Sequence, residues 1–356
     1  MNEQTNNGMN ALVTPSNSKK RTVVVTGGTG FLGSHLLPTL RERGVSVRVL
    51  LRPGTPPAAL PPDVEYRVGD IRDAGALREA FRDATTVFHL AGLTVPYGPR
   101  HRYLEINVEG TAAVLDACLA ARIQRLVYVS SMVVLGIECD RRGLAEDAPY
   151  ATSFVSAYEE SKVRAEQLVL ERARTAGLPA VVVRPGMAWG PRDRVMLPAL
   201  VRAMALPFFF MVGNGRNTLD LSYSGNIAHA LWLSATRGEA VGRIYNVADG
   251  FGITCRQYLT AIAGSLGLPV PRRRLPRGLV QFLMHVVLPP EPEPKDVTRP
   301  SHGHLLRMCA LFRDSEPNTG RIRTELGFVP PVDFATGVTE TVAWYRSAVA
   351  ASQTGR

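Results

Sequence analysis

Short apolar segments alternate with amphipathic segments along the first half of the chain. The first apolar run is Val23-Val24-Val25, and further runs of strand length lie at 45–51, 64–68, 86–90, 125–130 and 180–183. Segments with helical periodicity lie between them, at 34–43, 74–81, 106–121 and 156–176. Strands that alternate with helices of this length predict an α/β fold with a doubly wound parallel sheet and right-handed crossovers.

This alternation ends near residue 190. Residues 203–211 are mostly apolar, and 289–294 read Pro-Pro-Glu-Pro-Glu-Pro. Between these stretches, 227–235 predicts a helix and 244–247 predicts a strand that returns to the main sheet. We therefore predict a disordered polar tail at 1–20, a main domain at 21–190 that 219–249 rejoins, and a smaller, discontinuous C-terminal lobe at 191–218 and 250–346.

A glycine-rich turn follows the first predicted strand directly. It reads Thr26-Gly27-Gly28-Thr29-Gly30-Phe31-Leu32-Gly33 and leads into a predicted helix. Glycines let the backbone approach a pyrophosphate, and the start of a helix offers free N–H groups and a positive dipole end. A glycine pattern alone is weak evidence, but its place between a strand and a helix predicts a dinucleotide site.

The composition restricts the class of protein. A chain of 356 residues with 45% hydrophobic content can bury a large core. No apolar run approaches the roughly 18 residues that span a bilayer, and the polar N-terminus lacks the apolar core of a secretory signal. The cysteines at 118, 139, 255 and 309 lack paired metal-ligand spacing. We therefore expect a soluble, cytoplasmic protein without a metal site.

The net charge of +10 raises the question of an anionic partner. The arginines are dispersed and mostly lack interleaved aromatics, so we expect no nucleic-acid partner. The densest cluster, Arg272–Arg274 with Arg277, precedes the apolar stretch 279–288. Two interpretations stay open for this cluster: a peripheral contact with an anionic membrane, or a solvated turn before a helix of the lobe.

Three polar residues predict a proton-transfer site. Tyr158 and Lys162 are four residues apart on a predicted helix, so they face the same side. A tyrosine near its usual pKa of roughly 10 is a poor acid or base at neutral pH, and a nearby ammonium group favours the phenolate. Ser131 follows the strand at 125–130, at the sheet edge where ligands bind. We predict that these three residues are catalytic.

Taken in order, the glycine turn, Ser131 and the Tyr158/Lys162 pair resemble the extended branch of the short-chain dehydrogenase/reductase superfamily, the NAD-dependent epimerase/dehydratase superfamily. The resemblance covers about residues 21 to 346 and includes the segments 69–73, 89–92, 106–111 and 184–191, although Trp189 stands where tyrosine is more usual. It implies a Rossmann domain that binds NAD(P), a substrate-binding lobe, and a homodimer formed through the helices at 106–121 and 156–176.

The resemblance also implies roles for individual residues. Contacts to the cofactor are expected from Gly27, Thr29, Gly30, Phe31, Leu32, Gly33, Arg52, Asp70, Ile71, Leu90, Ala91, Gly92, Asn107, Tyr158, Lys162, Pro185 and Met187. Hydride would pass between the nicotinamide and a carbinol or carbonyl carbon. Tyr158 would exchange the proton of the oxygen, Lys162 would also hold the nicotinamide ribose, and Ser131 would hydrogen-bond the same oxygen.

The end of the second strand bears on the choice of cofactor. An acidic residue there would accept hydrogen bonds from the ribose of NAD, whereas a basic residue accommodates the 2′-phosphate of NADP. This chain has Leu51 followed by Arg52. NADP is therefore favoured over NAD, with the alternative that Arg52 stacks on the adenine of either cofactor or lies in solvent.

The segment 213–223 bears on the substrate. Nucleotide-sugar enzymes of the extended branch usually have a diphosphate-binding arginine where this chain has Leu219, and an aliphatic side chain cannot replace its charge-assisted hydrogen bonds. The pattern looks closer to the group of 3β-hydroxysteroid dehydrogenases and long-chain β-keto acid reductases. The apolar stretches 208–212 and 279–288 either line a hydrophobic pocket or form the core of the lobe. Residues 139–146 are expected to be an unremarkable variable loop.

These observations predict an NAD(P)-dependent oxidoreductase. It would interconvert a secondary alcohol and a ketone on a hydrophobic substrate, either steroid-like or a β-hydroxy/β-keto acyl compound, in a direction that the sequence does not encode. One alternative is a nucleotide-sugar 4-epimerase or dehydratase with tightly bound NAD. A second is a non-catalytic NADP-binding protein on the same fold, which the intact Ser131, Tyr158 and Lys162 disfavour.

Overall fold

The structure is a computed structural model that describes residues 22–94, 98–137, 141–206, 209–270, 273–286 and 314–354. Several sequence predictions fall outside these residues. They concern the tail at 1–20, Phe208, the proline run at 289–294, Arg272, Leu288, and the cysteines at 139 and 309.

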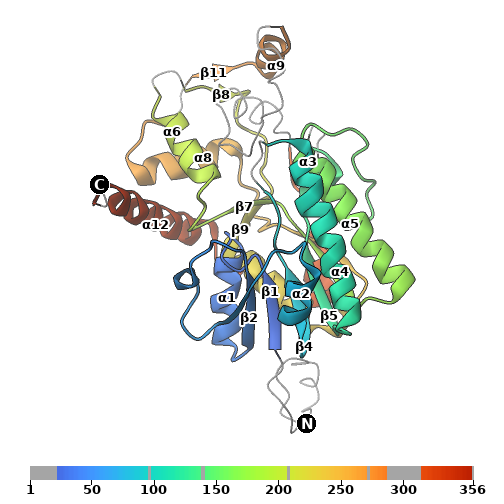
Figure 1. The fold of residues 1–356 in the computed structure, drawn as a ribbon. Helices are drawn as coiled ribbons and strands as arrows, with labels where there is room; N and C mark the ends of the chain where they lie inside the picture. Colours follow the sequence, from blue (N-terminus) through green and yellow to red (C-terminus); the bar gives the residue numbers. More distant parts are fainter. Residues whose placement is uncertain are drawn as a thin grey trace, which may run out of the picture.

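Seven parallel strands form the central sheet, in the order β10-β6-β5-β4-β1-β2-β3 (Figure 1). The strands are β1 (Thr22–Thr26), β2 (Ser46–Leu51), β3 (Glu65–Val68), β4 (Ala84–His89), β5 (Arg125–Val129), β6 (Ala180–Pro185) and β10 (Ile244–Val247). The predicted doubly wound Rossmann sheet is confirmed. Its strand order reverses between β1 and β4, which is where this architecture binds its ligand.

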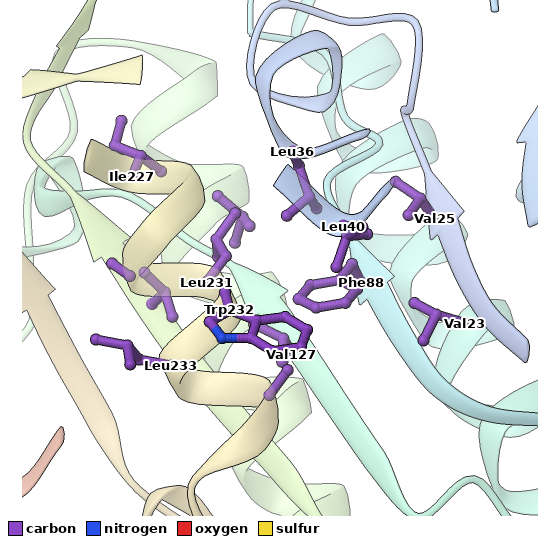
Figure 2. Close-up of a cluster of buried hydrophobic side chains, with 14 of the residues drawn as sticks. Val23, Val25, Leu36, Leu40, Phe88, Val127, Ile227, Leu231, Trp232 and Leu233 are labelled. Atoms are coloured by element: carbon purple, nitrogen blue, oxygen red, sulfur yellow. The ribbon is translucent and has the colours of Figure 1, made fainter. Parts of the chain in front are cut away.

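Helices cover both faces of the sheet. On one face lie α1 (Gly33–Glu42) and α7 (Ser224–Thr236), and on the other lie α2 (Ala74–Phe81), α4 (Gly110–Ala120) and α5 (Ala157–Ala176). Figure 2 shows the core on the first face, where Leu36 and Leu40 of α1 meet Phe88 of β4 and Leu231 of α7. Each of these side chains is fully buried, which contributes about 1.5–3 kcal/mol per residue to folding.

One predicted helix is divided in the structure. The sequence pattern predicts a single helix at 106–121, whereas the chain forms α3 (Arg100–Tyr103), a π-helical turn at Leu104–Glu109, and then α4. The wider turn places Asn107 inside the protein, with 2% of its surface exposed. Turns of this type are frequent at functional sites.

The remaining elements extend beyond the carboxyl edge of the sheet (Figure 1). Two short parallel pairs form there, β7 (Met187–Trp189) with β9 (Leu221–Tyr223), and β8 (Met211–Val212) with β11 (Arg274–Leu275). The accompanying helices are α6 (Met196–Met204), α8 (Cys255–Leu266), α9 (Arg277–Val286) and α12 (Phe334–Thr354), while α11 (Gly320–Leu326) packs beside β10. The exact division into two domains stays a prediction.

Trp189 explains part of the packing of these elements. Its ring contacts Tyr223, Tyr258 and Phe334 at centroid distances of 5.1, 5.8 and 5.6 Å. A Cβ on Gly337 of α12 would lie 2.7 Å from the same ring, so α12 can pack here because this residue has no side chain. The large indole at this position therefore joins β7 to α8 and α12.

A helix that crosses a bilayer needs about 20 mostly apolar residues. In the part of the chain that the structure describes, no helix is both long enough and apolar enough to span a membrane.

Candidate active site

The glycine turn between β1 and α1 is tightly packed by its own chain. Gly27 has φ +73°, and a Cβ there would lie 2.7 Å from the backbone nitrogen of Ala91. A Cβ on Gly33 would lie 2.2 Å from the Gly27 carbonyl oxygen. Thr29 and Gly30 are exposed, and no side chain caps the start of α1. These features fit a pyrophosphate, because a helix start without a side-chain cap, next to exposed glycine backbone, is a suitable place for an anion.

The segment that follows β4 lies against this turn. Leu90 N donates to the Thr26 carbonyl (3.2 Å), and Ala91 N donates to Thr26 Oγ1 (3.3 Å). A Cβ on Gly92 would lie 3.1 Å from Asn107 Oδ1. Residues 90–92 therefore lie against the glycine turn at the carboxyl ends of β1 and β4, and their contacts to a cofactor stay a prediction.

Asn107 connects this segment to the helix α5. Its Oδ1 accepts from Leu93 N (2.6 Å), and its Nδ2 donates to the Leu93 carbonyl (3.0 Å) and to Ser161 Oγ (2.9 Å). All polar atoms of the amide are thus engaged within the protein. Asn107 therefore acts here as a support for the crevice wall beside Tyr158 and Lys162.

Asp70, Ile71 and Arg52 lie at the other end of the predicted cofactor crevice. Arg72 binds Asp70 through Nε (2.7 Å), and this hydrogen bond holds the pKa of the Asp70 carboxyl below its usual value. Arg52 is exposed, and its charge lowers the same pKa further. Leu51 is buried, with 1% of its surface exposed. The end of β2 therefore offers a ligand the cationic side chain of Arg52 and no carboxylate.

Ser131 and Tyr158 meet at the carboxyl end of β5. Ser131 begins the 3₁₀ turn at Met132–Leu135, where its Oγ accepts from Val133 N (3.3 Å). Ser131 is near enough to the Tyr158 hydroxyl to affect its pKa, although the two residues are 27 positions apart in the sequence. Desolvation raises the pKa of Tyr158 to about 12, and the Ser131 hydroxyl opposes this rise.

Lys162 lies behind this pair, one helical turn along α5. Its Nζ donates to the Val129 carbonyl (2.8 Å) and lies 5.2 Å from the centre of the Tyr128 ring. Burial lowers the pKa of Lys162 to about 8, while the charge of Glu166 raises it. The expected lowering of the Tyr158 pKa by Lys162 is wrong for this arrangement, because the ammonium is directed to the β5 backbone.

Glu166 and Arg184 are site residues that the sequence analysis missed. Arg184 Nη2 lies 2.5 Å from Glu166 Oε1, and both side chains are fully buried, at 1% and 0% exposure. Ser130 Oγ and Tyr150 Oη also donate to the Glu166 carboxylate. The spacing of four residues between Lys162 and Glu166 places both on one helix face, which could have identified this partner.

Residues 139–146 are more than the variable loop that we expected, over the part from 141 that the structure describes. Arg141 Nη1 donates to the Met132 carbonyl (3.3 Å), next to Ser131. Glu146 Oε1 accepts from Asn246 N (3.0 Å) on β10. Both side chains are buried. Hydrophobic patterning does not reveal such a loop, because charged residues that are buried in pairs have the same sequence pattern as charged residues on the surface.

Pro185 and Met187 lie where β6 leaves the sheet. Gly186 N donates to the Val247 carbonyl (3.0 Å), and Met187 N donates to the Asp220 carbonyl (2.8 Å). A Cβ on Gly186 would lie 2.1 Å from the Asp220 carbonyl oxygen. This segment is thereby held across the carboxyl end of the sheet, as expected for a wall of the cofactor crevice.

Comparison with known proteins agrees with this geometry. The model of a family described as "NAD dependent epimerase/dehydratase family" matches residues 23–248, which is more than half of the chain. The chain belongs to this epimerase/dehydratase family. The matched residues contain the glycine turn, Ser131, Tyr158 and Lys162.

Two curated proteins illustrate which members of the family are similar. A 4-hydroxy-2-methyl-3-oxo-4-farnesyl-3,4-dihydroquinoline-1-oxide ketoreductase from Stigmatella aurantiaca is 31% identical over 317 residues, or 88% of this chain and 93% of that protein. A 3 beta-hydroxysteroid dehydrogenase/Delta 5-->4-isomerase from Mycobacterium tuberculosis is 32% identical, over 91% of this chain and 90% of that protein.

Among solved structures, a UDP-glucose 4-epimerase from Thermus thermophilus in complex with NAD is also similar. It superposes with a TM-score of 0.68 at 26% identity, covering 92% of this chain and 99% of that one. The epimerase/dehydratase family thus includes both oxidoreductases and epimerases that resemble this chain.

Proposed function

We propose that this protein is an NAD(P)-dependent oxidoreductase that interconverts a ketone and a secondary alcohol on a hydrophobic substrate. The observation that supports it most directly is the position of Tyr158, on the first turn of α5, beside Ser131 at the carboxyl end of β5, where Ser131 lowers the pKa of the buried phenol. The ketoreductase and hydroxysteroid dehydrogenase relatives support the reaction and the substrate class. Either a steroid-like or a β-keto acyl compound fits this proposal.

Each of the three residues has a separate task. Nicotinamide, when bound, supplies or accepts the hydride. Tyr158 holds its proton at neutral pH because desolvation raises its pKa to about 12, and Ser131 opposes this rise. Its role is to pass that proton to the carbonyl oxygen once hydride transfer makes that oxygen strongly basic. Ser131 Oγ can donate to the same oxygen as negative charge develops. Lys162 remains cationic at pH 7 and supports the site from the side of β5.

The replacement Tyr158→Phe tests the proton-transfer role. It removes one hydroxyl at the end of an otherwise unchanged ring, so turnover of any ketone substrate should fall by about 10²–10⁴-fold. Cofactor affinity, measured by the fluorescence of bound NADPH, should remain. Tyr103→Phe is a matched control, because its ring lies 6.5 Å from that of Tyr158. Equal activity in wild type and Tyr158→Phe would exclude the proposed mechanism.

We also propose that NADP is preferred over NAD. Arg52 supplies an exposed cation at the end of β2, whereas Leu51 cannot accept hydrogen bonds from a ribose. In fluorescence titrations, Arg52→Gln should weaken NADPH binding by about tenfold, about 1.4 kcal/mol, and leave NADH binding nearly unchanged. Tighter binding of NADH than NADPH by the wild type would reverse this preference.

The epimerase alternative makes a different prediction for the cofactor. An epimerase oxidises and reduces the same carbon, so it shows no net consumption of NADPH. Leu219 disfavours it, because the side chain offers no cation for a sugar-nucleotide diphosphate.

Homodimerisation through α4 and α5, a cytoplasmic location and a peripheral membrane contact of the Arg273–Arg277 region stay predictions.

A further inference from the structure

The strand β3 forms one edge of the central sheet, and among the described strands it pairs with β2 alone. Gly69 N, just after β3, donates to the Leu51 carbonyl of β2 (2.9 Å). Backbone groups of successive strand residues point to alternate sides, so those of Arg67 also face β2, whereas those of Tyr66 and Val68 face outward. The Tyr66 carbonyl accepts from the Arg67 side chain (2.9 Å), as expected for a carbonyl on the open side.

One face of this edge carries two opposite charges. Arg48 of β2 donates to two backbone carbonyls at the end of α2 (2.9 and 2.7 Å) and pairs with Glu65 at 3.0 Å, so Glu65 lies on the α2 side of the sheet. Arg67 pairs with Glu65 at 2.6 Å and lies on the same side. Both side chains are exposed. The edge thus presents a carboxylate and a guanidinium on either side of the outward-facing Tyr66.

The other face of the edge is apolar. Tyr66 and Val68 have 39% and 58% of their surface exposed. Tyr66 also borders a cleft of about 400 Å³, whose other lining residues include Pro57, Ala58, Pro61 and Pro62. Exposed apolar surface beside an unpaired strand edge is typical of a place where a further strand can add.

A second copy of this edge is complementary to it in the antiparallel orientation. When a two-fold axis passes through Tyr66, the two copies of this residue exchange both backbone hydrogen bonds. Glu65 of one copy then lies opposite Arg67 of the other, in a non-hydrogen-bonded pair, where opposing side chains are closest. The symmetry repeats this match, so each carboxylate meets a guanidinium of the other copy.

The same charges disfavour other occupants of the edge. Charged side chains on an edge strand usually prevent the addition of an arbitrary strand, because they lose their hydration without gaining a counter-charge. A parallel copy in register would place Glu65 beside Glu65 and Arg67 beside Arg67, and like charges directly opposite are destabilising. The antiparallel copy is the arrangement in which both charges find partners.

We propose that β3 is an interface between two copies of this chain, which join their sheets edge to edge by antiparallel pairing centred on Tyr66. On the apolar face, the two Tyr66 side chains lie opposite each other beside the proline-lined cleft. The contact differs from the homodimer expected through α4 and α5, because α5 packs near β6, on the other side of β1 from β3. It does not depend on the proposed enzymatic function.

Sedimentation equilibrium of the full chain measures this association. Arg67→Glu places carboxylates opposite each other twice across the contact, so the mass of the assembly should fall to half of the wild-type value or less, whether or not α4 and α5 also associate. Arg202→Glu is a matched control that reverses an exposed arginine on α6 and should leave the mass unchanged. Equal masses of wild type and Arg67→Glu would overturn the proposal.

Mixing two charge-reversed variants is a sharper test. Arg67→Glu and Glu65→Arg each repel their own copies, but they complement each other, so only their mixture should regain association. Tyr66→Pro serves as a further variant, because it removes an outward-facing N–H and no hydrogen bond to β2. It should reduce the mass as Arg67→Glu does, with its fold checked by thermal denaturation. A mixture of folded variants that does not associate would overturn the proposal.

Oxidative cross-linking tests the register. In the proposed pairing, the two Tyr66 Cα atoms are about 5.5 Å apart, within the range of a disulfide, whereas the two Val68 Cα atoms are more than about 13 Å apart. Tyr66→Cys should therefore form cross-linked dimers well above the wild-type background, and Val68→Cys should not. Equal cross-linking of the two variants would overturn the proposal.

Other occupants of the edge give different results. If residues 1–20 of the same chain cover β3, the full chain has the mass of Arg67→Glu, and deletion of these residues raises it. If a different protein occupies the edge, the purified chain has the same mass with and without Arg67→Glu. Both results would overturn self-association through β3.

Discussion

Replacing Lys162 with methionine measures how much the burial of the Lys162 ammonium group lowers the free energy of unfolding. Lys162 has 6% of its surface exposed, and burial lowers its pKa from 10.5 to about 8. At 1.36 kcal/mol per pKa unit, this difference corresponds to about 3 kcal/mol of stability that the folded state loses while the lysine is charged. Methionine removes this cost, but it also removes the donor to the Val129 carbonyl, which costs about 1–3 kcal/mol.

The pH dependence separates the two contributions. Below pH 8 the lysine is protonated in both the folded and the unfolded chain, so the wild type bears the whole cost of burial. Between pH 8 and 10.5 the unfolded chain binds more protons than the folded one, so wild-type stability rises with pH. The stability of Lys162→Met relative to wild type should therefore be highest at neutral pH and fall by about 3 kcal/mol as the pH approaches 10.5.

Urea unfolding of both proteins at pH 7, 8, 9 and 10 tests this expectation, with m-values used to confirm that the transitions are comparable. Arg164→Met is a matched control, because it removes an exposed cation from the same helix and should give a difference that is constant with pH. A stability difference for Lys162→Met that is constant or rises with pH would refute the argument.

Two further substitutions test the scaffold. Glu166→Gln leaves the buried Arg184 without its counter-charge, so the free energy of unfolding should fall by about 3–5 kcal/mol in denaturant titrations. Glu171 is exposed on the same helix, and Glu171→Gln should change the free energy of unfolding by less than about 0.5 kcal/mol. Gly33→Ala places a Cβ 2.2 Å from the Gly27 carbonyl and should lower both stability and NADPH affinity. Gly264→Ala in α8 meets no atom within 4 Å, and there a gain of about 0.5–1 kcal/mol is expected. Stabilisation by Gly33→Ala would contradict the close packing of the turn.

The fold was predictable because its determinants are local. Apolar runs such as Val23–Val25 and the periodicity of helices such as α2 reflect burial on known faces, and the observed bounds of α2 and β10 match the predicted ones. The turn, the serine and the tyrosine–lysine pair likewise lie on elements at the carboxyl edge of the sheet, while their roles stay predictions. The π-helical turn at Leu104–Glu109 was missed, since the hydrophobic pattern of so short a segment does not distinguish i→i+5 from i→i+4 hydrogen bonds.

Interactions between distant residues were not predictable from the sequence. The direction of the Lys162 ammonium depends on the Val129 carbonyl, 33 positions away, and not on its helical spacing from Tyr158. Pairing of β8 with β11 likewise joins segments more than 60 residues apart. Periodicity and spacing report on neighbours along one element, so they do not reveal such contacts.

The central claim is net hydride transfer to a hydrophobic ketone, and isotope transfer tests it most directly. NADPH deuterated at the reactive position of the nicotinamide should be incubated with a 3-ketosteroid and with a 3-ketoacyl thioester, and the products analysed by mass spectrometry. The account predicts one deuterium on the new carbinol carbon per NADPH consumed, and its loss in Tyr158→Phe. Unlabelled products from both ketones, together with epimerisation of a UDP-sugar without NADPH consumption, would contradict it.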